Sequence, residues 1–188
     1  DENLLQTGYN LNIKKDYPEI FQHLKQFEGD LKDRADQGVD WWNLRACKYY
    51  DKFELPEKIV WALTSDRWAF ALDDKGHYLP SNGYILTSVV TPVKYILGLL
   101  NSRLMRYYFR FIGVMTAGGA YTLKAATIEA LPYRKPKADD IKDVVSIVTN
   151  ILIRKSKNKE CDVSSLEKKI DAIIYKVYGL SAAEAEMI

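Results

Sequence analysis

Short runs of β-branched and aromatic residues, separated by turn residues, constrain the fold of this chain most. They occupy residues 58–63, 67–72, 78–79 and 84–87. Runs of this length and composition are typical of β-strands, and turns such as "DDKG" at 73–76 favour antiparallel pairing of their neighbours. We therefore expect an antiparallel meander in the middle of the chain.

Helical periodicity flanks these runs on both sides. Apolar residues three and four positions apart predict an amphipathic helix over 18–36, with Asp16 as its N-cap. The stretch "VKYILGLLNSRLMRYYFRF" predicts a second helix from Pro92 to Phe111. From Asp139 onward, the apolar spacing predicts long helices.

Caps and turns mark the later elements. We expect a flexible or tightly turned loop at "VMTAGGAY", a strand over 121–124, one helical turn and then a strand over 131–133. Two pairs have the spacing of capping boxes, Ser164 with Glu167 and Ser181 with Glu184. Gly179 is placed to end a helix. The pattern predicts an α+β fold, a small antiparallel or mixed sheet flanked by helices. Residues 1–137 would form one domain and residues 138–188 a helical tail.

The net charge of +2 is distributed unevenly along the chain. Residues 1–80 carry a net charge of −4 and residues 138–188 a net charge of −1. Residues 81–137 carry eight basic side chains and one acidic side chain, a net charge of +7. A segment this basic within a nearly neutral protein indicates a surface that faces a polyanion.

Several other classes of protein lack support. The apolar runs are shorter than the ~20 residues that span a bilayer, and "DENLLQTGYN" does not resemble a secretory signal, so we expect a cytoplasmic location without a membrane partner. Cys47 and Cys161 are 114 positions apart without a CxxC motif or a nearby histidine. We expect both to be reduced structural thiols and expect no zinc.

Catalytic motifs are also not recognisable. A glycine-rich cofactor loop, an Asn-Pro-Pro-Tyr motif and a nucleotide-phosphate loop do not occur, so we expect no cofactor, no small-molecule substrate and no catalytic residue. Asp66 with Asp73, Asp74 and Lys75 approximates the carboxylate and lysine pattern of metal-dependent nucleases. A hairpin turn explains the same residues.

Several segments, in this order, resemble the TaqI-like C-terminal specificity domain family. They are "YPEIFQHLKQFEGDLKDR", "WWNLR", "YYDKFELPEKIVW", "FALDDKGHYLPSNGYILT", "YILGLLNSRLMRYYF", "GGAYTL" and "IEALPYRKP". The closing "SSLEKKIDAIIYKVYGLSAAEAEMI" is similar to the tail of type IIG restriction-modification proteins. The resemblance implies a non-catalytic target recognition domain. Such a domain selects the DNA sequence on which an adenine methyltransferase, often fused to an endonuclease, acts in bacterial defence.

The resemblance implies double-stranded DNA as a partner, together with methyltransferase or nuclease domains of the same or an associated chain. Arg103, Arg106 and Arg110 recur at helical spacing and are expected to contact phosphates. The candidates for reading base edges are Arg45, Lys48, Asn82, Tyr121, Lys124 and Arg134. Four further residues are expected at the interface: Gly118, Gly119, Thr122 and Lys135.

Alternative interpretations stay open at this point. Trp41 and Trp42 suit apolar packing as well as base stacking, and Arg45 could pair with an internal carboxylate. The chain could instead be a protein docking module for a methyltransferase or nuclease partner, or a divergent metal-dependent nuclease. Whether it is a fragment or a stand-alone specificity subunit is also open.

Overall fold

The computed structural model describes residues 12–35, 38–43 and 50–188. Its contacts divide the chain into two compact units, Asp1–Phe53 and Glu54–Ile188. No helix within the described ranges combines the length and the apolar content that crossing a membrane requires.

The described part of the first unit contains short helices instead of the long helix expected over 18–36. They are α2 (Ile13–Asp16), α3 (Pro18–Lys25), α4 (Glu28–Lys32) and α5 (Tyr50–Phe53). The expectation was wrong in extent, because the N–H groups of Gln26 and Phe27 bond to carbonyls three residues back and tighten the chain into a turn. It was also wrong about the cap: Asp16 lies in α2, where its carboxylate accepts from the backbone N–H of Asn12 at 2.8 Å.

Trp41 and Trp42 pack within the first unit. The Phe21 ring lies 5.9 Å from the Trp41 ring and 5.4 Å from the Trp42 ring, measured between centroids. The guanidinium group of Arg34 donates to the carbonyls of Trp41 and Asn43 at 2.9 and 2.8 Å. The tryptophan pair therefore contributes to apolar packing around α3, one of the two roles expected from the sequence.

Three strands of the second unit form sheet A: β1 (Lys58–Ala62), β3 (Ala71–Asp73) and β4 (Gly83–Leu86). All pairings are antiparallel, and Ile59 pairs with Leu72 on one side and Leu86 on the other. The strand order is β3-β1-β4, so the expected meander was wrong. The most buried strand, β1, takes the centre, with Ile59 fully buried. Residues 78–79 form no strand.

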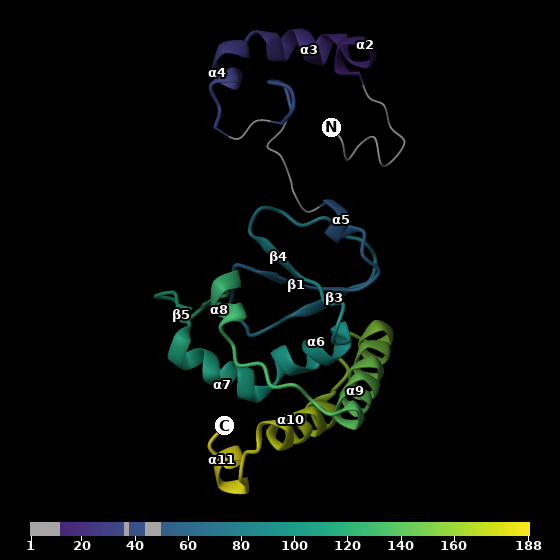
Figure 1. The fold of residues 1–188 in the computed structure, drawn as a ribbon, viewed down its shortest axis with the longest axis vertical. Coiled ribbons are helices and arrows are strands. Elements are labelled where there is room, and N and C mark those ends of the chain that lie inside the picture. The colour runs from purple at the N-terminus through teal and green to yellow at the C-terminus, as the bar shows by residue number, and fades with distance from the viewer. Residues whose placement is uncertain (1–11, 36–37, 44–49) are drawn as a thin grey trace. The chain divides into compact units, whose positions relative to one another are not determined.

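Sheet B is smaller and contains β2 (Thr64–Ser65), β5 (Val114–Met115) and β6 (Tyr121–Thr122). The central strand β6 pairs antiparallel with both neighbours, in the order β2-β6-β5. The strand β5 is an edge strand, and Figure 1 shows it at the edge of the unit, after the end of α7. The α+β class is confirmed, with two small antiparallel sheets.

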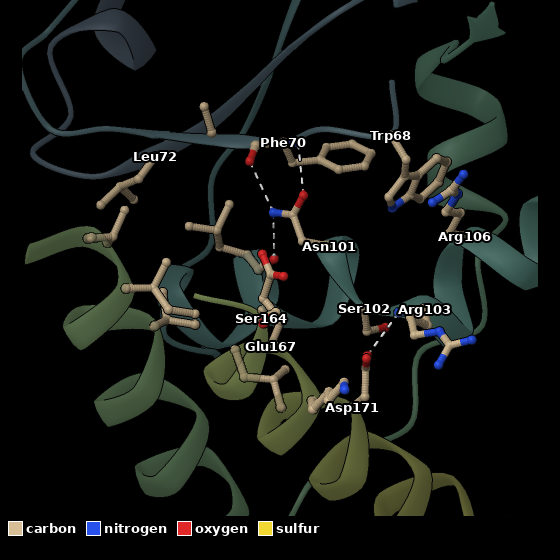
Figure 2. Close-up of a pocket in the computed structure, with 18 residues that line it drawn as sticks. Trp68, Phe70, Leu72, Asn101, Ser102, Arg103, Arg106, Ser164, Glu167 and Asp171 are labelled. Atoms are coloured by element: carbon tan, nitrogen blue, oxygen red, sulfur yellow. Dashed lines mark hydrogen bonds between the residues drawn. The ribbon is translucent and has the colours of Figure 1, made fainter. Parts of the chain in front are cut away.

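The segment 92–111 forms two helices, α6 (Val93–Asn101) and α7 (Arg103–Ile112), where one was expected. Ser102 separates them because its backbone is extended, with φ −66° and ψ 154°. Its hydroxyl donates to the Leu99 carbonyl at 2.7 Å and accepts from the Met105 N–H, which caps α7. The Asn101 amide exchanges hydrogen bonds with the Phe70 backbone at 3.0 and 3.1 Å, tying α6 to the segment before β3 (Figure 2).

The remaining helices are α8 (Ala125–Glu129), α9 (Ala138–Lys157), α10 (Ser164–Tyr178) and α11 (Ala182–Glu186). The capping box of Ser181 and Glu184 is confirmed, and Gly179 ends α10 with φ 74°. The capping box expected at Ser164 was wrong, because Val163 occupies the N-cap position. The strand expected over 131–133 is also absent: these residues are irregular.

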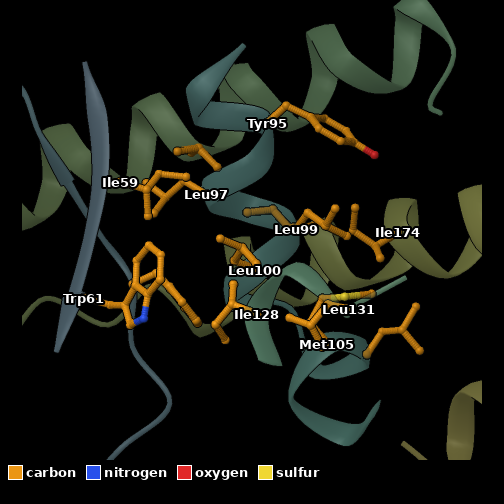
Figure 3. Close-up of a cluster of buried hydrophobic side chains, with 14 of the residues drawn as sticks. Ile59, Trp61, Tyr95, Leu97, Leu99, Leu100, Met105, Ile128, Leu131 and Ile174 are labelled. Carbon is orange, nitrogen blue, oxygen red and sulfur yellow. The ribbon is translucent and has the colours of Figure 1, made fainter. Parts of the chain in front are cut away.

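The core of the second unit surrounds α6. Figure 3 shows Ile59 and Trp61 of β1 facing Leu97 and Leu100 of α6, with Ile174 of α10 in the same cluster. On the other side of α6, Gly98 allows close approach of α9: a Cβ atom there would lie 2.8 Å from a methyl carbon of Val144. Helices α9 and α10 therefore share one apolar core with sheet A.

Candidate nucleic-acid interface

The three arginines expected to contact phosphates all lie on α7. Arg103, Arg106 and Arg110 are exposed, and their spacing of three and four residues places them on one face of the helix. Because Ser102 starts a new helix immediately before them, α7 changes direction relative to the buried helix α6. The arginines are therefore exposed on α7, whereas most of α6 is buried in the core.

These guanidinium groups carry little internal compensation. Among the described residues, no carboxylate lies within 4.0 Å of any of them. Arg110 lies over the ring of Tyr107, 5.8 Å from its centroid, and Arg106 donates to the Tyr121 hydroxyl at 3.0 Å. Both contacts orient a cation without neutralising it, so the charge remains available to an anionic partner.

The backbone of Arg103 is anchored to α10. Its backbone N–H donates to the Asp171 carboxylate of α10 at 2.9 Å. Burial raises the pKa of Asp171 above its ordinary value, and the N–H and the charge of Arg103 oppose this shift only in part. Figure 2 shows Asp171 and Arg103 at the same end of a cavity of about 610 Å³ between α6, α9 and α10.

The Tyr121 side chain is buried beneath Arg106. Its ring contacts Trp68 and Phe109, with centroids 5.7 and 5.8 Å away, and only its hydroxyl reaches the surface arginine. The sequence predicted Tyr121 as a residue that meets DNA directly. The structure gives it a further role, as a support that positions Arg106. The next residue, Thr122, is half-buried in β6.

The glycine pair lies in the loop that joins β5 to β6. The N–H of Gly119 donates to the Thr116 carbonyl at 2.9 Å, and the N–H of Thr116 donates to the Ala120 carbonyl at 2.8 Å. Gly119 has φ 80°, which L-residues rarely adopt, whereas Gly118 has no such constraint. Of the two forms expected from the sequence, flexible or tightly turned, the loop takes the tight turn, and only Gly119 adopts a conformation that favours glycine.

Asn82 and Lys124 are exposed, and backbone hydrogen bonds through Leu63 connect the segments that carry them. The carbonyl of Asn82 accepts from the N–H of Leu63 at 2.8 Å, and the carbonyl of Leu63 accepts from the N–H of Leu123 at 2.7 Å. Lys124 follows directly and occupies the N-cap position of α8. Both residues therefore lie close to sheet B, at the end of β1.

Arg134 and Lys135 are positioned differently. The Arg134 guanidinium donates to the Tyr178 carbonyl at 2.8 Å, and its N–H donates to the Tyr178 hydroxyl at 3.3 Å. Arg134 thus ties the segment after α8 to the end of α10. Within the described part of the chain, no hydrogen bond connects these two residues to α7 or to the β5–β6 hairpin. Arg45 and Lys48 lie outside the described residues.

The carboxylates of the nuclease-like pattern are dispersed or engaged. Asp73 accepts from Lys58, buried in β1, at 2.7 Å and from the His77 ring at 2.8 Å. Burial alone would raise the pKa of Asp73, but the bonds from Lys58, His77 and the Lys75 N–H outweigh it and hold the pKa well below its ordinary range. Within the described ranges, no three His, Cys, Asp or Glu side chains are grouped so that they could hold a metal ion.

One structural support of the arginine face, Trp68, had only a weak signal in the sequence. Trp68 donates its indole N–H to the Leu100 carbonyl at 2.7 Å, and its ring packs against Phe109 beneath Arg106. Figure 2 shows the Trp68 indole beside the Arg106 side chain. The aromatic run "RWAF" indicated a strand. Trp68 meets α7 at Phe109, which is distant in the sequence, so no local signal could reveal this contact.

The fold and this surface define a small α+β domain with a basic face suited to nucleic acid. The chain belongs to the TaqI-like C-terminal specificity domain family, whose profile matches residues 7–133. Family membership assigns it a role in DNA sequence recognition in restriction-modification systems. No curated protein matches the chain.

Proposed function

We propose that this chain is the target recognition module of a restriction-modification enzyme. It would direct an adenine methyltransferase, with or without an endonuclease, to a particular DNA sequence in the cytoplasm and would itself catalyse no reaction. The methyltransferase and nuclease domains would belong to the same or an associated chain, as in type IIG proteins. Residues 138–188 would act as a spacer or docking surface for these domains.

The observation that carries this proposal is the exposed arginine face of α7 beside the β5–β6 hairpin. Arg103, Arg106 and Arg110 have no carboxylate within 4.0 Å among the described residues, and each is available to a phosphate. Phosphate contacts position a protein on the duplex but do not read its sequence. The exposed side chains of Asn82 and Lys124, and the loop at Gly118 and Gly119, are the candidates for contact with base edges.

Salt-dependent binding to duplex DNA tests the proposal. Fluorescence anisotropy of the full chain with a labelled random-sequence duplex should give an affinity that falls steeply with salt. The logarithmic slope is about −0.9 per phosphate contact. Replacement of Arg103, Arg106 and Arg110 by alanine should flatten this slope by about 2 to 3.

A matched control removes the same charge elsewhere. Lys142, Lys157 and Lys159 are exposed on or after α9, and their replacement by alanine should leave the slope close to that of the wild type. Equal losses in both variants would mean that the chain has only a diffuse attraction to DNA. Salt-insensitive binding to a methyltransferase or nuclease domain, with no DNA binding at low salt, would favour the docking alternative.

A further inference from the structure

Exposed apolar side chains follow the arginine face along the chain, at the end of α7 and in β5. Phe111, Val114 and Met115 are 70%, 62% and 49% exposed, although they lie within five consecutive residues. We call these three residues the hairpin patch. Single exposed apolar side chains are common, but three within five consecutive residues at the end of α7 and in an edge strand indicate a binding surface.

The local backbone holds the hairpin patch outward. Gly113 ends α7 so close to the Phe109 ring that a Cβ atom there would lie 2.2 Å from it. The backbone therefore contacts the core at Gly113, whereas the side chains of Phe111 and Val114, on either side of it, are exposed. Val114 pairs with Thr122 and Met115 with Tyr121 at the edge of sheet B, so one side of the strand remains unpaired.

The charges around the hairpin patch favour an anionic occupant. Arg106 and Arg110 precede the patch on α7, and Glu129 is the one acidic residue in the segment 81–137. A protein partner for this surface would need an apolar centre with an acidic rim. The major groove of DNA offers the same combination: thymine methyl groups on its floor and phosphates along its edges. The groove also admits a two-stranded β-ribbon.

We propose that the β5–β6 hairpin enters the major groove and that Val114 and Met115 contact the C5-methyl groups of thymines. These contacts would make A·T base pairs part of the recognised sequence, since thymine alone among the four bases presents a C5-methyl group in the major groove. The arginines of α7 would hold the neighbouring phosphates and set the register of the hairpin. This inference rests on the proposed function and adds to it the residues that read a particular chemical group.

Substitution of uracil for thymine tests the inference directly, because it removes only the methyl group. The preferred duplex is first selected from a random library with the wild-type chain. Its affinity is then measured with thymine and with deoxyuridine, for the wild type and for the near-isosteric variants Val114→Thr and Met115→Gln. Each lost methyl contact should weaken wild-type binding about fourfold. The variants should bind the thymine duplex more weakly and show a reduced further loss with deoxyuridine.

A matched control uses another exposed valine. Val89 is 103% exposed in the loop before α6, and Val89→Thr should retain the full response to deoxyuridine. If the wild type binds both duplexes equally, or if both hairpin variants keep the full response, the inference is overturned while the proposed function stands. If no salt-dependent binding to DNA occurs, both are overturned.

Discussion

The buried ion pair between Lys58 and Asp73 gives the sharpest prediction about stability. The Lys58 side chain is fully buried, the Asp73 side chain is 4% exposed, and the two charged atoms are 2.7 Å apart. The two residues also face each other in the β1–β3 pairing. Asp73→Asn would therefore remove the negative charge that lies against the buried ammonium group of Lys58. Removing one partner of such a pair costs about 3 to 5 kcal/mol.

That cost is a large part of the total stability of a domain of this size, which is roughly 5 to 15 kcal/mol. Urea unfolding of the full chain, followed by far-ultraviolet circular dichroism, would report mainly on α9 and α10, which share the core with sheet A. With a dependence of about 2 kcal/mol per molar urea, the midpoint should fall by on the order of 2 M. The control is Asp74→Asn, at an exposed position in the same turn.

The same pair predicts a pH dependence. The pKa of Asp73 is lower in the folded chain than in the unfolded chain. The unfolded state therefore binds more protons below about pH 4, so stability should fall as the pH decreases through that range. Asp73→Asn should lose this contribution to the acid sensitivity.

An unfolding free energy of Asp73→Asn within about 1 kcal/mol of the wild type at neutral pH would refute the reasoning about the buried ion pair.

This result also bears on the nuclease alternative. Loss of activity in Asp73→Ala would not identify a metal ligand, because the substitution removes an internal ion pair. Asp66 is a better probe: its side chain is 82% exposed, and its ion-pair partner is the equally accessible Arg67. Magnesium-dependent cleavage of DNA that is abolished in Asp66→Asn, with folding unchanged, would support a nuclease.

Two further predictions concern glycines. Gly119→Ala should destabilise the β5–β6 hairpin by roughly 1 kcal/mol, because an L-residue is strained at φ 80°, while Gly118→Ala should be nearly neutral. Thermal unfolding of both variants checks this, and equal shifts would contradict it. Gly98→Val should cost at least 1 to 3 kcal/mol, roughly the range for overpacking, because even its Cβ would lie 2.8 Å from a methyl carbon of Val144. Urea unfolding measures this cost, and Gly29→Val, with open space around it, is the comparison; a similar effect in both would argue against tight packing of α6 on α9.

Local signals in the sequence determined many of the elements. The apolar spacing after residue 138 predicted α9 and α10, since a helix that buries one face shows it in its own period. The capping box of Ser181 and the stop at Gly179 depend only on neighbouring residues and were also correct. The spacing of Arg103, Arg106 and Arg110 predicted one shared face because all three lie within α7.

The tertiary structure decided what depends on distant partners. The strand β1 lies between β3 and β4 because the core buries it most deeply. The strand-like segments of the sequence do not by themselves indicate this order. The break at Ser102 interrupts an apolar pattern that continues through it. Lys58 pairs with Asp73 across two strands, and Arg106 rests on Tyr121 of sheet B. Sequence periodicity therefore predicts which face of an element is buried. Which other element packs against that face depends on how segments that are distant in the sequence fit together in one core.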